Sequence, residues 1–260
     1  YILFMSNKYD ELIAKIEEIK KIYPKKKDVL FLQTGPSLND LEDKYSKLPQ
    51  SFYDTHWIIA LKNSINICNK LNIIPDFFIK NSWGDSTNRE VFNYLKKKNS
   101  NIVTIGVSNG SDKQDYDFIV SIDWGGSRIN QFIDIPMMKP KSCEFLNNNN
   151  SIVTGWAHMA MEIGLPLCVL LKPTNIYCLG WDFCKTKHNW FNNIEYYKYN
   201  LKYVLKKQDG GNQYIHNGSK YTKMIDSIPK YLKKFYNINI YKNSNKSCLN
   251  FEYIDLNSIM

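Results

Sequence analysis

Residues 28–38 read Asp-Val-Leu-Phe-Leu-Gln-Thr-Gly-Pro-Ser-Leu, and this stretch sets the expected fold. Its first half is a short apolar run, which is typical of a strand that is buried on both faces of a sheet. Its second half contains Gly35, Pro36 and Ser37, which are residue types that end a strand and begin a loop. A buried strand that leads into such a loop is typical of the parallel sheets of α/β proteins.

The same alternation extends along the chain. Expected strands cover residues 57–61, 76–80, 101–107, 117–122, 175–179 and 237–241, and expected helices cover residues 9–22, 64–71, 89–97, 154–163, 194–207 and 221–236. The pattern predicts an α/β fold with a Rossmann-like, mostly parallel sheet flanked by helices. Residues 123–151 break the pattern, and we expect a small lid excursion over residues 123–151 and 185–219, the second of which contains the expected helix at residues 194–207. A length of 260 residues suits a single domain over residues 1–260.

The charge balance favours an acidic partner. The sequence holds 34 Lys and Arg against 25 Asp and Glu, a net charge of +9. The basic runs at residues 25–27, 96–98, 206–207 and 233–234 are expected to be solvated helix ends or loops. No nucleic-acid recognition motif accompanies them, so a nucleic-acid binder ranks last among the function classes. No apolar run reaches the ~20 residues of a membrane-spanning helix. Peripheral contact of the basic surface with an anionic membrane stays open.

The six cysteines show neither a CxxC pair nor a spacing with histidines that suits zinc. Several stand inside apolar stretches, where a free thiol behaves as a small buried hydrophobic group. We therefore expect a reducing compartment, the cytoplasm, and no metal site.

Polar residues and glycines follow several of the expected strands. Because the carboxyl ends of parallel strands meet at one edge of a sheet, these residues predict a nucleotide site there. Ser37 could cap the next helix or bind an anion, and Asp182 could bind a ribose hydroxyl or stabilise its own turn. Taken singly, each motif favours an ordinary turn or cap, and it is their repetition after successive strands that favours a nucleotide site. The candidate nucleotide-binding residues are Gln33, Thr34, Gly35, Ser37, Asn63, Asn81, Ser82, Thr154, Gly155, Asp182 and Phe183.

In their order, these motifs resemble those of the bacterial lipooligosaccharide sialyltransferases and the related flagellin-modifying glycosyltransferases. The resemblance runs from about residue 28 to the C-terminus. It implies an inverting glycosyltransferase that moves a sugar, such as a nonulosonic acid, from a CMP-activated donor to a glycan acceptor. It also implies a homo-oligomer and a reaction without a metal or another cofactor. The DxD sequence at residues 115–117 is read as a surface turn.

The resemblance places a general base in the loop before the last long helix, where His216 stands. His188 is the second candidate, and Trp190 stands near the position of a family tyrosine that supports the leaving phosphate. A histidine that titrates near neutrality can take the proton of an acceptor hydroxyl. Ser151 and Cys184 replace a family arginine and a family tyrosine, which leaves an inactive nucleotide- or glycan-binding module open.

A second resemblance is to the archaeal-type pterin pyrophosphokinases, through Gly-Pro-Ser-Leu at residues 35–38 and Ile-Pro-Asp-Phe at residues 74–77. It implies transfer of a diphosphate from ATP with Mg²⁺, which needs acidic ligands. Asp85 and Asp182 could serve, but the sequence shows no clear acidic cluster. We rank this alternative below the glycosyltransferase.

Overall fold

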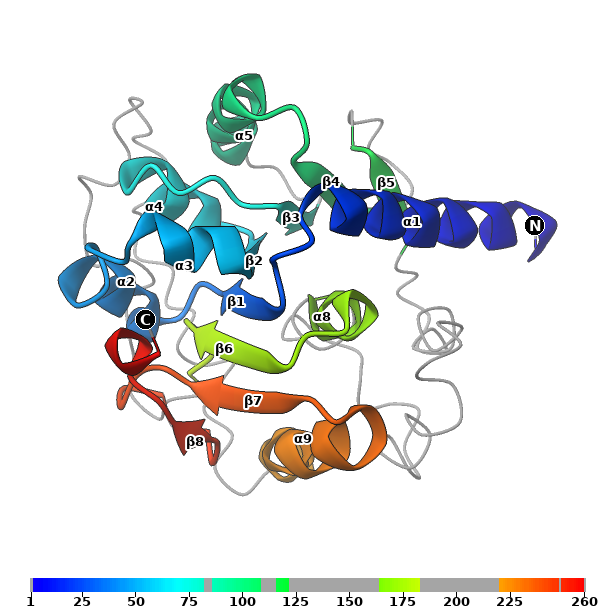
Figure 1. Cartoon of the computed structure of the whole chain (residues 1–260). Coiled ribbons are helices and arrows are strands. Elements are labelled where there is room, and N and C mark those ends of the chain that lie inside the picture. Colours follow the sequence, from blue (N-terminus) through cyan, green and yellow to red (C-terminus); the bar gives the residue numbers. More distant parts are fainter. Residues whose placement is uncertain are drawn as a thin grey trace.

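The computed structural model describes residues 2–81, 86–108, 116–121, 164–182, 220–247 and 249–259. Within them lies an eight-stranded sheet with the order β5-β4-β3-β2-β1-β6-β7-β8 (Figure 1). Every neighbouring pair of strands is parallel. The strands are β1 (Asp28–Leu32), β2 (His56–Leu61), β3 (Phe77–Asn81), β4 (Val103–Ser108), β5 (Phe118–Ser121), β6 (Asn175–Leu179), β7 (Asn239–Lys242) and β8 (Glu252–Tyr253).

Helices cover both faces of this sheet (Figure 1). One face packs against α1 (Ile2–Ile22), α8 (Leu165–Leu171) and α9 (Lys220–Tyr236). The other packs against η1 (Pro36–Asn39), α2 (Asp40–Asp43), α3 (Gln50–Thr55), α4 (Ser64–Lys70), α5 (Ser86–Lys98) and η5 (Leu256–Ser258). The predicted α/β fold, a parallel sheet flanked by helices, is confirmed.

The strand β1 lies at the centre and explains why its sequence is apolar without alternation. Val29 and Phe31 enter the core beneath α8 and α9, and Leu30 and Leu32 enter the core on the opposite face. All four side chains are fully buried. A strand that is covered on both faces needs apolar residues at every position, so the quoted stretch predicts a central strand correctly.

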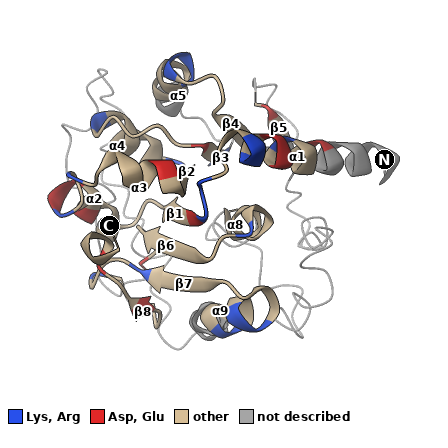
Figure 2. Cartoon of the chain, viewed as in Figure 1, with Lys and Arg blue, Asp and Glu red and all other residues tan. Residues whose placement is uncertain are grey.

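The basic runs of the sequence differ in their surroundings. Lys96–Lys98 and Lys233–Lys234 stand in the last turns of α5 and α9, where cations complement the helix dipole (Figure 2). The run at residues 206–207 lies outside the described residues. For Lys26 the expectation of a solvated side chain is wrong, because its ammonium forms a buried ion pair with Asp76 at 2.7 Å. Burial there is possible because the carboxylate supplies the counter-charge.

The described cysteines behave as the sequence predicts. Cys68, Cys168 and Cys178 are buried free thiols, and burial raises the pKa of Cys68 to about 12. Such thiols are protonated near neutrality and act as small apolar groups in the core. Among the helices of the described ranges, none is long and apolar enough to cross a membrane.

His56, at the start of β2, gives a pH-dependent prediction. Its Nδ1 lies 2.7 Å from the Phe52 carbonyl oxygen, its ring stacks on that of Phe52, and burial lowers its pKa below 6.5. Below about pH 6.5 the unfolded chain therefore binds a proton that the folded chain does not, and the free energy of unfolding falls as pH falls.

We expect His56→Gln to show a smaller loss of stability than the parent between pH 7 and pH 5.5. The difference is at most about 1.4 kcal/mol for each unit by which the pKa is lowered. Urea unfolding at both pH values measures it. Equal losses for the two proteins would contradict the assignment.

Candidate functional site

The order of the strands places a topological switch point beside β1. From β1 the sheet continues to β2 and β3 on one side and to β6 and β7 on the other. After β1 the chain continues to η1 and α2 on one face of the sheet, whereas α9, the next described helix after β6, lies on the other face. In open α/β sheets, ligands bind at this point. The loops after β1 and β6 are therefore the expected position of a ligand site.

At the switch point, Ser37 and Asp182 join these two loops. Asp182 Oδ2 accepts a hydrogen bond of 2.7 Å from the backbone N–H of Ser37, and Oδ1 accepts another from the Ser37 hydroxyl. The Ser37 Oγ in turn accepts a bond of 2.7 Å from the N–H of Gly180. Both side chains are at most 5% exposed. Each oxygen of the buried carboxylate therefore accepts a hydrogen bond from Ser37, and the two bonds fix the loop after β1 to the turn after β6.

Two glycines permit the close approach of these loops. Gly35 donates its N–H to the Gly180 carbonyl at 2.8 Å, and a Cβ on Gly35 would stand 2.5 Å from that oxygen. Gly180 has a φ of +78°, and a Cβ there would lie 2.2 Å from the Gln33 carbonyl oxygen. A side chain at either position would force the loops apart.

The structure thus gives two predicted residues a role within the protein. The Ser37 hydroxyl bonds to Asp182 and Gly180, and the side chain of Asp182 holds the neighbouring loop in addition to its own turn. Contact of either with a nucleotide stays a prediction. Thr34 is 8% exposed, and the buried Nε2 of Gln33 has no hydrogen-bond partner among the described residues. Gln33 therefore has a side-chain donor to offer at this edge of the sheet.

We expect Asp182→Ala to destabilise the fold by about 1–3 kcal/mol, because it leaves two buried donors of Ser37 without this acceptor. Asp43→Ala is the control, since the Asp43 side chain is 60% exposed and pairs with Lys246 at 4.0 Å. Its effect should stay within about 0.5 kcal/mol. Urea unfolding compares the two variants, and equal effects would rule out a structural role for the Ser37–Asp182 contact.

The loop after β2 contacts the end of β1 and carries a lysine that the sequence did not single out. The Ser64 hydroxyl donates to the carbonyl of Leu32, the last residue of β1, at 3.2 Å. Asn63 precedes α4 but makes no side-chain cap to it. Lys62 has a φ of 51°, a left-handed conformation that is uncommon for lysine. Asn81 ends β3, two strands from β1, so it lies farther from the switch point.

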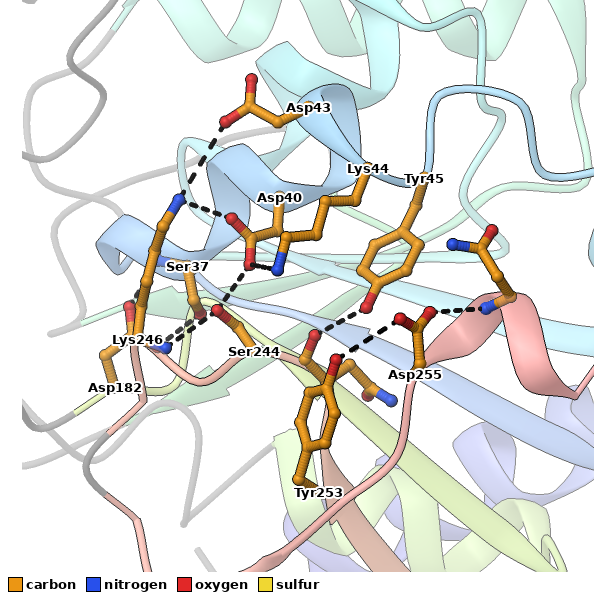
Figure 3. A network of polar contacts seen from close by, with 12 residues as sticks. Ser37, Asp40, Asp43, Lys44, Tyr45, Asp182, Ser244, Lys246, Tyr253 and Asp255 are labelled. Atoms are coloured by element: carbon orange, nitrogen blue, oxygen red, sulfur yellow. Dashed lines mark hydrogen bonds and ion pairs between the residues drawn. The ribbon is translucent and has the colours of Figure 1, made fainter.

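The loop after β7 forms the other flank, through a network around Asp40 (Figure 3). Ser244 Oγ donates to Asp40 Oδ2 at 2.6 Å, and the Lys246 ammonium donates to Oδ1. Lys44 lies 3.4 Å from the same carboxylate. Burial alone would raise the pKa of Asp40, but the bonds from Lys246 and Ser244 and the charges of Lys246 and Lys44 hold it below its usual value. Asp40 therefore stays ionised and ties α2 to the loop after β7.

Two further contacts complete this flank. The Tyr45 hydroxyl donates to the Asn243 carbonyl at 2.9 Å, and the Ser247 hydroxyl donates to the Trp181 carbonyl at 2.8 Å. The loops after β1, β6 and β7 are consequently cross-linked to one another. A polar run after the last long strand, residues 243–247, was the signal in the sequence that could have found this flank.

The predicted surface turn at residues 115–117 is described in part. Asp117 accepts hydrogen bonds from the N–H and the hydroxyl of Thr104, both at 2.8 Å, and pairs with Lys96. These contacts attach the start of β5 to β4. In the parts of the chain that the structure describes, no group of three or more His, Cys, Asp or Glu residues could hold a metal ion.

The remaining candidates lie outside the described residues. They are Ser82, Thr154, Gly155, Phe183, His188, Trp190 and His216, together with the side chain of Asn81 and both lid segments. The structure therefore brings together predicted residues of the loops after β1 and β6, and the residues outside the described ranges stay predictions.

Comparison with known proteins finds similarity in structure but not in sequence. No protein-family model matches the sequence, and no curated protein matches it. A solved structure described as MAf glycosyltransferase from Magnetospirillum magneticum AMB-1 is similar, with a TM-score of 0.45 and 10% sequence identity. The match covers 90% of this chain and 34% of that protein, so the chain spans about a third of its length. The assignment of function therefore rests on the residues of the chain itself.

Proposed function

We propose that this chain is a glycosyltransferase that takes a sugar from a nucleotide-activated donor. The donor is a CMP-linked nonulosonic or related keto-sugar acid, and the acceptor is a glycan or glycoconjugate. The observation that carries the proposal is the junction of the loops after β1 and β6 at the switch point, made by Ser37 and Asp182. Two of the motifs on which the family resemblance is based, at residues 35–38 and 180–183, meet at this junction through Ser37 and Asp182.

The side chains at this edge of the sheet favour a ligand with a phosphate over a plain apolar ligand. The loop after β1 contains Gly35 and the Gln33 Nε2, which has no partner among the described residues, and the loop after β2 adds Lys62. Hydrogen-bond donors at the carboxyl edge of a parallel sheet suit phosphate oxygens. The contacts of Ser37 and Asp40 hold the loops after β1, β6 and β7 together, so we expect donors on these loops to be in place before the ligand binds.

The proposed reaction is a displacement with inversion. The acceptor hydroxyl oxygen attacks the anomeric carbon of the donor and forms the new glycosidic bond. The bond between that carbon and the CMP phosphate oxygen breaks, and its electron pair leaves with the phosphate. The proton of the hydroxyl passes to a histidine, which we propose is His216.

Thermal unfolding with CMP, CDP, UDP and ATP, each with and without Mg²⁺, tests the donor class. We expect CMP to raise the melting temperature more than the other nucleotides do, with the same shift when Mg²⁺ is absent. A shift for ATP that needs Mg²⁺ would favour the pyrophosphokinase-like alternative instead. CMP binding without transfer or donor hydrolysis would indicate an inactive binding module.

A further inference from the structure

Lys62 differs from the other partly buried lysines of the described chain. Its ammonium makes no hydrogen bond or ion pair with a described residue, whereas Lys26, Lys70 and Lys242 all have such partners. The side chain of Lys62 is half-buried, and burial alone lowers its pKa to about 8. A cation that has lost part of its hydration without gaining a counter-ion is an energetic cost to the fold.

The backbone around Lys62 holds this residue at the carboxyl edge of the sheet. Its N–H donates to the Ile79 carbonyl at 2.8 Å, which extends the pairing of β2 with β3 by one residue. Two residues later, Ser64 bonds to the carbonyl of Leu32 at the end of β1. Lys62 therefore follows β2 at the same edge at which Gln33 follows β1.

Two donors without described partners thus stand at the ends of adjacent strands. The first is the Lys62 ammonium and the second is the buried Nε2 of Gln33. Both groups donate hydrogen bonds, and the ammonium also carries a positive charge. Asp40 and Asp182, the buried carboxylates of the described loops after β1 and β6, are bound to Lys246, Ser244 and Ser37 instead. The complementary ligand is therefore an anion rich in acceptors.

We propose that the Lys62 ammonium and the Gln33 side-chain amide bind a phosphate group of the ligand, with Lys62 as its counter-ion. This inference rests on the proposed function for the identity of the phosphate, because in the proposed function that phosphate belongs to the CMP-linked donor. A charge-assisted hydrogen bond to a phosphate in a partly buried place contributes strongly to affinity. Without Lys62, the affinity for CMP should fall by about 10- to 100-fold.

Calorimetry with CMP and with cytidine tests the assignment, because cytidine lacks the phosphate. We expect Lys62→Met to lose affinity for CMP and to keep that for cytidine, and Lys62→Arg to recover part of the CMP affinity. Gln33→Leu should show the same selectivity with a smaller loss. Lys172→Met is the matched control. Lys172 has the same left-handed backbone, with a φ of 53°, but is exposed and precedes β6 at the opposite edge.

A measurement on the parent protein covers the case in which a variant fails to fold. CMP or pyrophosphate should slow the reaction of Lys62 with an amine-specific reagent and leave the reaction of Lys172 unchanged, as read by peptide mass spectrometry. Protection by pyrophosphate with no binding of CMP would uphold the phosphate site and overturn the CMP donor. Equal loss of CMP and cytidine in Lys62→Met, or no protection by any of these phosphates, would overturn the inference.

Discussion

Asp76→Ala is expected to lower the free energy of unfolding by about 3–5 kcal/mol, because it leaves the buried ammonium of Lys26 without its counter-ion. The two carboxylate oxygens accept from Lys26 at 2.9 and 2.7 Å, and Oδ2 also accepts from the Ile58 N–H at 2.8 Å. The Lys26 ammonium donates to the His56 carbonyl as well, at 2.9 Å. Removal of Asp76 therefore leaves the Lys26 ammonium without its counter-ion and the Ile58 N–H without its acceptor.

The same reasoning predicts recovery in a double variant. Replacing both partners, Lys26→Met with Asp76→Leu, removes the buried charges together, so the part of the loss that comes from the unpaired cation should return, while the Ile58 N–H stays without its acceptor. Glu18→Ala is the control, because Glu18 pairs with Lys15 on the exposed surface of α1 and should matter by less than about 1 kcal/mol. Urea unfolding measures all of these variants. A loss for Asp76→Ala no larger than that for Glu18→Ala would contradict the role of the pair.

Most of the fold was predictable because the central strands are buried on both faces. The strands expected at residues 57–61 and 175–179 correspond to β2 and β6, within one residue at each end. The helix α8 was missed because all seven of its residues are buried, so it lacks the apolar and polar alternation that identifies a helix. The two-residue strand β8 is too short to produce a pattern at all.

The site was predictable as a set of loops but not as a set of contacts. The position of Gly35, Ser37 and Asp182 after buried strands places them at one edge of the sheet. Asp182 accepts hydrogen bonds from Ser37, 145 positions away in the sequence, because β1 and β6 are neighbours in the sheet. No local sequence pattern determines the order of the strands. Lys26 was misjudged for the same reason, because its partner Asp76 is 50 positions away.

The histidine of the proposed reaction yields the largest expected effect on catalysis. If His216 takes the proton of the acceptor hydroxyl, His216→Ala should lower the rate of transfer by about 10²–10⁴-fold. The affinity for CMP should change little, since the base acts on the acceptor and not on the donor. His216 precedes α9 by four positions in the sequence, in the segment where the resemblance places the base.

The pH dependence separates a base from a residue that is merely structural. The neutral imidazole is the working form, so the parent should lose activity as the pH falls through the pKa of the base, and His216→Ala should lack that inflection. His188→Ala is the matched variant, assayed for both transfer and donor hydrolysis. Full activity in His216→Ala with loss of activity in His188→Ala would assign the base to His188. Full activity in both variants would mean that neither histidine removes the proton, and the displacement would need another base.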